Sequence, residues 1–160
     1  MGGKKGSALV LQVLEAVLIA WIPAQLIYFS VQTIYPGPSE SVAYLNTPLK
    51  IFTMLILLAP MLETYMMKYM FVFMGKVIKS PTKINVIAAT AWGSMHWNSG
   101  SWGLYAVWAF FIMGICYMRL KERSTQHAVY IVMIMHAMFN GLSVGLDQAL
   151  KYWTSVEALS

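Results

Sequence analysis

The sequence predicts an all-α fold, a polytopic membrane helix bundle with about five transmembrane helices. Hydrophobic residues make up 59% of the 160 residues and charged residues only 11%, whereas a typical globular protein carries about 25% charged residues. The mean hydropathy is +0.62. The apolar residues gather into five long runs, and a helix needs about 20 such residues to cross a bilayer. These observations indicate an integral membrane protein.

The same composition excludes several other classes of protein. The charged residues are too few to coat a water-facing surface or to form a nucleic-acid interface. Cys116 is the only cysteine, so neither an internal disulfide nor a Cys-rich zinc site is expected. No Gly-rich phosphate loop is present, so no nucleotide is expected either. Without repeats or long linkers, residues 1–160 are expected to form a single membrane domain.

The spans follow from the apolar runs and from the residues that bound them. The N-terminal run is longer than the apolar part of a signal peptide and lacks an Ala-x-Ala cleavage site, so it is expected to stay in place. Thr47-Pro48 and Ser80-Pro81 each pair a capping side chain with proline at the first helical position. A break at residues 36–41 follows the first span. The predicted spans are residues 7–35, 48–75, 81–97, 102–118 and 126–146.

Basic residues in the connections predict the orientation. An excess of Lys and Arg marks the cytoplasmic side of a membrane protein. We therefore expect a prokaryotic cytoplasmic membrane protein with a cytoplasmic N-terminus and an extracytoplasmic C-terminus. Eight basic residues fall on one side and two on the other: Lys4, Lys5, Lys76, Lys79, Lys83, Arg119, Lys121 and Arg123 against Lys50 and Lys151.

A few polar residues lie inside the predicted spans. Placing a charged residue at the centre of a span costs on the order of 2.5–3.5 kcal/mol, so each is a functional hypothesis. The structural alternative is a hydrogen bond between helices. Glu15 and Lys68 lie at similar depth, and we expect them to form an ion pair. The remaining four are Glu63, His96, His136 and Asn140.

Three of these residues share one depth in the membrane. Each lies 13 residues from a basic residue at the same predicted membrane boundary, which is roughly 20 Å along a helix. Asn140 follows His136 by one turn, on the same helix face. We therefore expect all four to converge around one small polar cavity. The three pairs are Glu63 with Lys76, His96 with Lys83, and His136 with Arg123.

Small residues beside this group predict close helix packing. Ala88, Ala89 and Gly93 precede His96, and the sequence from Gly141 to Gly145 has the Gly-x-x-x-Gly form just after Asn140. Small residues allow membrane helices to approach backbone to backbone. We expect such contacts on both helices.

The four polar residues can support hydrolysis of an amide. A buried carboxylate beside imidazoles can deprotonate water, and an imidazole and an amide can donate hydrogen bonds to an oxyanion. The same carboxylate and two imidazoles could instead hold zinc, with water as the fourth ligand. The residues alone leave both mechanisms open.

The order and spacing of three motifs resemble a known family. On separate spans the chain carries Glu63-Thr64-x-x-x-Lys68, Trp92-x-x-x-His96 and His136-x-x-x-Asn140. They are similar to Glu-Glu-x-x-x-Arg, aromatic-x-x-x-His and His-x-x-x-Asn in the CAAX-protease and bacteriocin-processing family of intramembrane proteases. That family includes type II CAAX prenyl endopeptidases and immunity proteins. The resemblance covers a core of about residues 48–146 and leaves the N-terminal span as an addition.

The resemblance implies a glutamate-type intramembrane endopeptidase. Glu63 would be the general base, His96 would orient the water, and His136 and Asn140 would bind the oxyanion. The substrate would be a membrane-anchored protein or peptide in the lipid bilayer. The depth of the polar residues, rather than the resemblance, predicts a cut near the outer half of the bilayer. No cofactor and no metal are expected, although a zinc-dependent variant stays open.

Two positions depart from the family pattern. Thr64 replaces the second Glu and Lys68 replaces the Arg. With Trp92, they are predicted to support the site rather than to act in catalysis. The alternative is a catalytically inactive relative that serves as an immunity or scaffold protein. A small transporter or ion-relay subunit is a third reading, but such a protein would carry a chain of acids, and only one cluster is visible.

Overall fold

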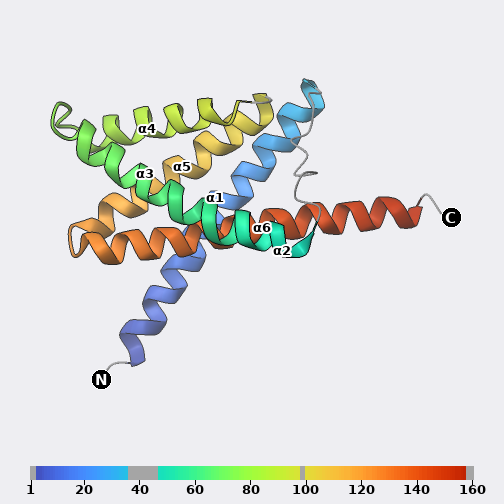
Figure 1. Ribbon diagram of the computed structural model, residues 1–160, viewed down its shortest axis with the longest axis horizontal. Helices are drawn as coiled ribbons and strands as arrows, with labels where there is room; N and C mark the ends of the chain where they lie inside the picture. The colour runs from blue at the N-terminus through green and yellow to red at the C-terminus, as the bar shows by residue number, and fades with distance from the viewer. Residues whose placement is uncertain (1–2, 36–46, 98–99, 158–160) are drawn as a thin grey trace.

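The computed structural model describes residues 3–35, 47–97 and 100–157, and within these ranges the secondary structure is helical (Figure 1). The predicted all-α bundle is therefore confirmed. The predicted break at residues 36–41 lies outside the described residues. The elements are α1 (Gly3–Ile34), α2 (Pro48–Ile51), the π-helix η2 (Phe52–Leu58), α3 (Ala59–Met74), α4 (Pro81–Met95), α5 (Gly100–Lys121) and α6 (Thr125–Glu157).

Four helical stretches of the described chain are long and apolar enough to cross a membrane. They correspond to four of the five predicted spans. The exception is α4, which has 15 residues and so reaches about 22 Å, against a hydrocarbon core of about 30 Å. It is a shorter fifth helix of the bundle. The four long stretches are Leu9–Ile34, Pro48–Met74, Gly100–Lys121 and Thr125–Glu157.

The second predicted span is not one regular α-helix. It begins as expected, because the Thr47 side chain accepts a hydrogen bond from the Lys50 N–H. The helix then widens into η2, where the N–H of Ala59 reaches back five residues to the Met54 carbonyl. Pro60 follows directly and is buried. Proline has no N–H and its ring collides with the carbonyl four residues earlier, which a regular α-helix does not accommodate.

Helix α5 occupies the centre of the bundle and packs against α1, α4 and α6. Figure 1 shows α1 crossing α5 and α6 steeply, while α3 runs beside α4 and α6. The buried core comes largely from α5 and α6, with Tyr105, Ala109, Met113 and Val132 among its members. Helix α1 and the stretch from α2 to α3 expose many large apolar side chains, as expected of surfaces that face lipid.

Close backbone packing is confirmed for α4 and wrong for α6. Ala88, Ala89 and Gly93 are buried, and a Cβ atom at Gly93 would lie 2.8 Å from the backbone oxygen of Gly103 in α5. A Cβ atom at Gly141 would make only an ordinary contact at 3.7 Å, and one at Gly145 would meet nothing within 4 Å. Neither glycine of α6 therefore makes a close backbone contact with another helix.

Helix α6 extends to Glu157 instead of ending near residue 146 as predicted. Neither glycine nor proline follows Gly145 before the helix ends. Side-chain pairs four residues apart stabilise the extra turns. Lys151 Nζ lies 2.6 Å from Asp147 Oδ2, and Trp153 Nε1 donates to Glu157 Oε1 at 2.7 Å.

The predicted ion pair between Glu15 and Lys68 is wrong. Helix α1 packs on α5 and α6 and shares no extended contact with α3. Glu15 is exposed. Lys68 Nζ instead lies 5.6 Å and 5.2 Å from the ring centroids of Tyr65 and Tyr69. The equal depth inferred from the sequence was not enough, because the two helices belong to different sides of the bundle.

Candidate active site

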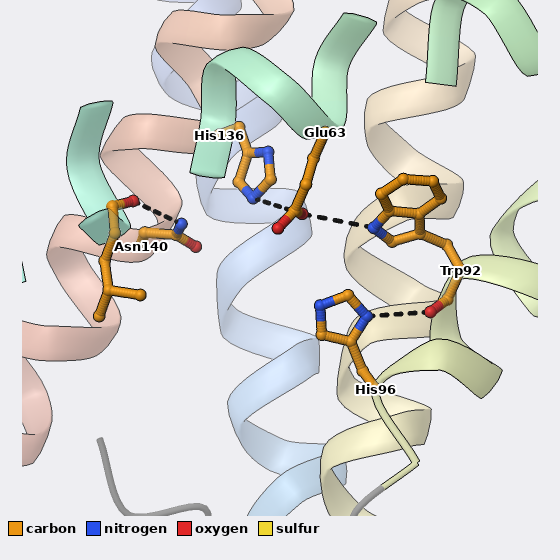
Figure 2. Close-up of polar contacts among 6 residues, drawn as sticks. Glu63, Trp92, His96, His136 and Asn140 are labelled. Carbon is orange, nitrogen blue, oxygen red and sulfur yellow. Dashed lines mark hydrogen bonds and ion pairs between the residues drawn. The ribbon is translucent and has the colours of Figure 1, made fainter. Parts of the chain in front are cut away.

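The carboxylate of Glu63 lies where α3, α4 and α6 meet (Figure 2). Its Oε2 accepts a hydrogen bond from Trp92 Nε1 at 3.3 Å and lies 3.7 Å from His136 Nε2. The Glu63 side chain is 22% exposed and that of His136 is 6% exposed. The structure therefore brings the predicted base, one predicted imidazole and the motif tryptophan together, with the Glu63 side chain partly exposed.

His96 lies beside this group at the C-cap of α4. Its Nδ1 donates to the carbonyl of Trp92 at 2.9 Å. A carbonyl can only accept, so the proton of the neutral ring is on Nδ1 and Nε2 keeps its lone pair. Figure 2 shows the ring facing the same space as the Glu63 carboxylate. Here the end of α4 sets the tautomer of the histidine.

The ring of Phe110, in α5, contacts the imidazoles of both His96 and His136. The sequence analysis did not predict this residue as part of the site. Its ring centroid lies 6.0 Å from that of His96, 5.4 Å from that of His136 and 5.1 Å from that of Trp92. The His136 contact is edge to face, with an interplanar angle of 86°. Nothing in the sequence marks this position, because Phe110 stands in an unbroken apolar run.

Asn140 is anchored to the π-helix η2. Its Nδ2 donates to the Leu55 carbonyl at 2.8 Å. That carbonyl is available because the Ala59 N–H is bonded to Met54 and Pro60 has no N–H to offer. A side-chain amide has two N–H groups, so one remains for a second acceptor. The structure thus places Asn140 one turn from His136 with its amide oriented by backbone.

The three supporting residues have different surroundings. Trp92 contacts Glu63 directly, as described above. Thr64 is 1% exposed, and its hydroxyl has no hydrogen-bond partner within the described residues. Lys68 follows Glu63 by five residues, about 140° around the helix. Its amine lies over Tyr65 and Tyr69, not against the Glu63 carboxylate.

The zinc alternative requires three protein ligands around one point. Across residues 3–35, 47–97 and 100–157, no three His, Cys, Asp or Glu side chains are arranged to hold a metal ion. The available donors therefore do not fit a three-ligand zinc site, and no step is routed through a metal below.

Comparison with known families places these residues in context. The family described as type II CAAX prenyl endopeptidase Rce1-like matches residues 45–142. The chain belongs to this family. The matched segment contains every predicted site residue and begins after the end of α1. No curated protein and no solved structure matches the chain. As a member of this protease family with four long apolar helices, the Rce1-like chain is an integral membrane protein of the intramembrane protease class.

Proposed function

We propose that the chain is a glutamate-type intramembrane endopeptidase that hydrolyses a peptide bond of a membrane-anchored protein or peptide. The observation that carries the proposal is the placing of the Glu63 carboxylate between Trp92 and His136, with His96 beside it. A carboxylate held in a largely apolar, partly open site is suited to take a proton from water.

The water would be activated by two groups. The indole N–H of Trp92 holds Oε2 of Glu63, so the other carboxylate oxygen can accept the water proton. His96 presents the lone pair of Nε2, because its Nδ1 proton is committed to the Trp92 carbonyl. The imidazole can therefore accept a second hydrogen bond from the same water and orient it towards the scissile carbonyl.

The oxyanion of the tetrahedral intermediate would be stabilised from α6. His136 supplies an imidazole N–H, and Asn140 supplies the amide N–H that Leu55 does not occupy. Donors fixed before the reaction stabilise charge that develops only in the transition state. Protonated Glu63 would then return its proton to the leaving amine.

The second candidate function is an inactive scaffold or immunity protein. Thr64 favours it, because this buried hydroxyl stands where the resembling family has a second carboxylate. Under the leading proposal the second carboxylate is not needed, since Glu63 alone has both its Trp92 partner and its histidine. The N-terminus is proposed to be cytoplasmic in a prokaryotic membrane, from the distribution of basic residues.

The test is cleavage of membrane-anchored peptides by the purified chain in liposomes, with prenylated and transmembrane anchors both offered. Glu63→Gln should abolish cleavage and keep the fold, whereas the same substitution at the exposed Glu15 should leave the rate unchanged. Asn140→Ala should lower kcat by about a hundred- to a thousandfold. Because the donors do not fit a three-ligand site, a chelator should have no effect.

Three results would contradict the proposal. Wild-type cleavage by Glu63→Gln would refute the role of the carboxylate. Loss of activity with chelator and recovery with zinc would refute the metal-free mechanism. A folded wild-type chain that cleaves neither class of anchored peptide, and binds one of them stably, would favour the scaffold function.

A further inference from the structure

A polar groove lies between α3 and α6, apart from the Glu63 carboxylate. It has a volume of about 370 Å³. Figure 1 shows α3 and α6 diverging towards the end of the bundle where α6 begins. The groove is lined by Tyr65, Lys68, Thr125, Gln126, Val129 and Tyr130. No acidic residue is among these lining residues, although one of them carries a full positive charge.

The α3 wall presents a held cation. Lys68 is half-buried, with its amine 5.6 Å and 5.2 Å from the ring centroids of Tyr65 and Tyr69. The faces of aromatic rings attract an ammonium group without neutralising it. Within the described residues, the carboxylate ion pairs are those of Glu63 and Asp147, and Lys68 takes part in neither. The Lys68 amine can therefore attract an anion into the groove.

The α6 wall presents hydrogen-bond donors. Thr125 and Gln126 form the first turn of the helix, and Ser124 caps it by accepting from the His127 N–H at 3.3 Å. Gln126 Nε2 donates to the Tyr130 hydroxyl at 3.2 Å, which leaves this amide a second N–H. The start of a helix also carries partial positive charge. Both walls thus favour an oxyanion between them.

The position of the groove indicates which anion it would meet. Six basic residues lie in the α3–α4 and α5–α6 connections or on the adjoining helix ends, at this end of the bundle, where basic residues attract anionic headgroups. Along α3, towards the middle of the bundle, Leu62 and Met66 are exposed and apolar, so an acyl chain has a surface to follow. We propose that the groove binds the phosphate of an anionic phospholipid. The six basic residues are Lys76, Lys79, Lys83, Arg119, Lys121 and Arg123.

The test is calorimetric titration of the full chain in neutral detergent with dioctanoyl phosphatidylglycerol. Wild type should bind saturably, and Lys68→Gln should weaken binding by about five- to tenfold, the effect of one basic group near a charged surface. Lys68→Arg should retain binding because it keeps the cation. Lys76→Gln, a lysine of the same end outside the groove, should leave the affinity within about twofold.

Other outcomes would overturn the proposal. Equal losses in Lys68→Gln and Lys76→Gln would mean diffuse attraction to the basic end. Inorganic phosphate or an acidic peptide binding as tightly as the lipid would mean that the ligand is a soluble anion or a protein tail. Should Lys68→Gln fail to fold, Gln126→Glu introduces a negative charge at an exposed position and must weaken lipid binding. Unchanged binding in Gln126→Glu would refute the site.

Discussion

Asn140 and Pro60 are distant in the sequence but meet through one backbone group, the carbonyl of Leu55. Pro60 withholds the N–H that would compete for this carbonyl, and Asn140 donates to it at 2.8 Å. The contact orients the amide without using the N–H proposed to face the oxyanion. A residue with no reactive group thereby helps to position one that has a role in the proposed chemistry.

Replacing Pro60 by Ala tests this positioning. The restored N–H can bond the Leu55 carbonyl and release Asn140, so kcat for peptide cleavage should fall by roughly tenfold, a part of the loss expected when an oxyanion donor is removed. KM should change little. Pro48→Ala is the matched control, because proline at the first helical position replaces an N–H that has no partner in any case. Unchanged kcat in Pro60→Ala would refute the positioning role.

Among the elements, α4 is the one whose packing controls the site most directly. It carries Trp92 and His96, and its buried face lies against α5 through Gly93. A side chain at Gly93 would collide with the backbone of Gly103, which cannot move aside as a flexible side chain could. The position of both site residues therefore depends on the absence of a side chain at Gly93, which directly follows Trp92 and lies about one turn before His96.

The effect of a side chain differs sharply between two glycines of the bundle. Gly93→Val should lower the free energy of unfolding by about 1–3 kcal/mol, the usual cost of overpacking, and should reduce cleavage. Gly145→Val introduces the same side chain where nothing lies within 4 Å, so its effect should stay within about 0.5 kcal/mol. Thermal unfolding in detergent measures both. Equal destabilisation by the two variants would contradict the close contact between α4 and α5.

At the scale of the whole molecule, the two connections between helices that are rich in basic residues lie at the same end of the bundle. Figure 1 shows the α3–α4 and α5–α6 connections at one end of the bundle and the C-terminus at the other. This arrangement agrees with the predicted sidedness, in which both connections face the cytoplasm. Their common side makes the orientation testable with single cysteines.

Single-cysteine labelling measures the orientation. Cys116 is the only native cysteine, so Cys116→Ser provides a clean background for Ser80→Cys, Ser124→Cys and Thr154→Cys. In intact cells an impermeant maleimide should label Thr154→Cys, on the last turns of α6, and spare the other two until the membrane is permeabilised. Labelling of Ser80→Cys and Ser124→Cys from opposite sides would contradict the bundle topology.

The sequence by itself determined the features that depend on side-chain type and local spacing. A low charge fraction and long apolar runs require a membrane bundle, since such surfaces are stable only in lipid. Polar residues in apolar spans are costly, so Glu63, His96, His136 and Asn140 stood out without a structure. Their equal offsets from basic residues supplied depth, which the helical rise fixes at about 1.5 Å per residue.

The depth of a residue in the membrane does not determine how its helix is rotated or which helices pack beside it. The tertiary structure decided both. Glu15 and Lys68 share a depth but lie on helices that do not pack together, so no ion pair forms between them. Phe110 and Leu55 both have apolar side chains, yet Phe110 contacts the two histidines and the Leu55 carbonyl binds Asn140. Gly93 contacts a neighbouring backbone and Gly145 does not. Which face of a helix meets which neighbour is set by packing across the whole bundle, and no local pattern of residues records it.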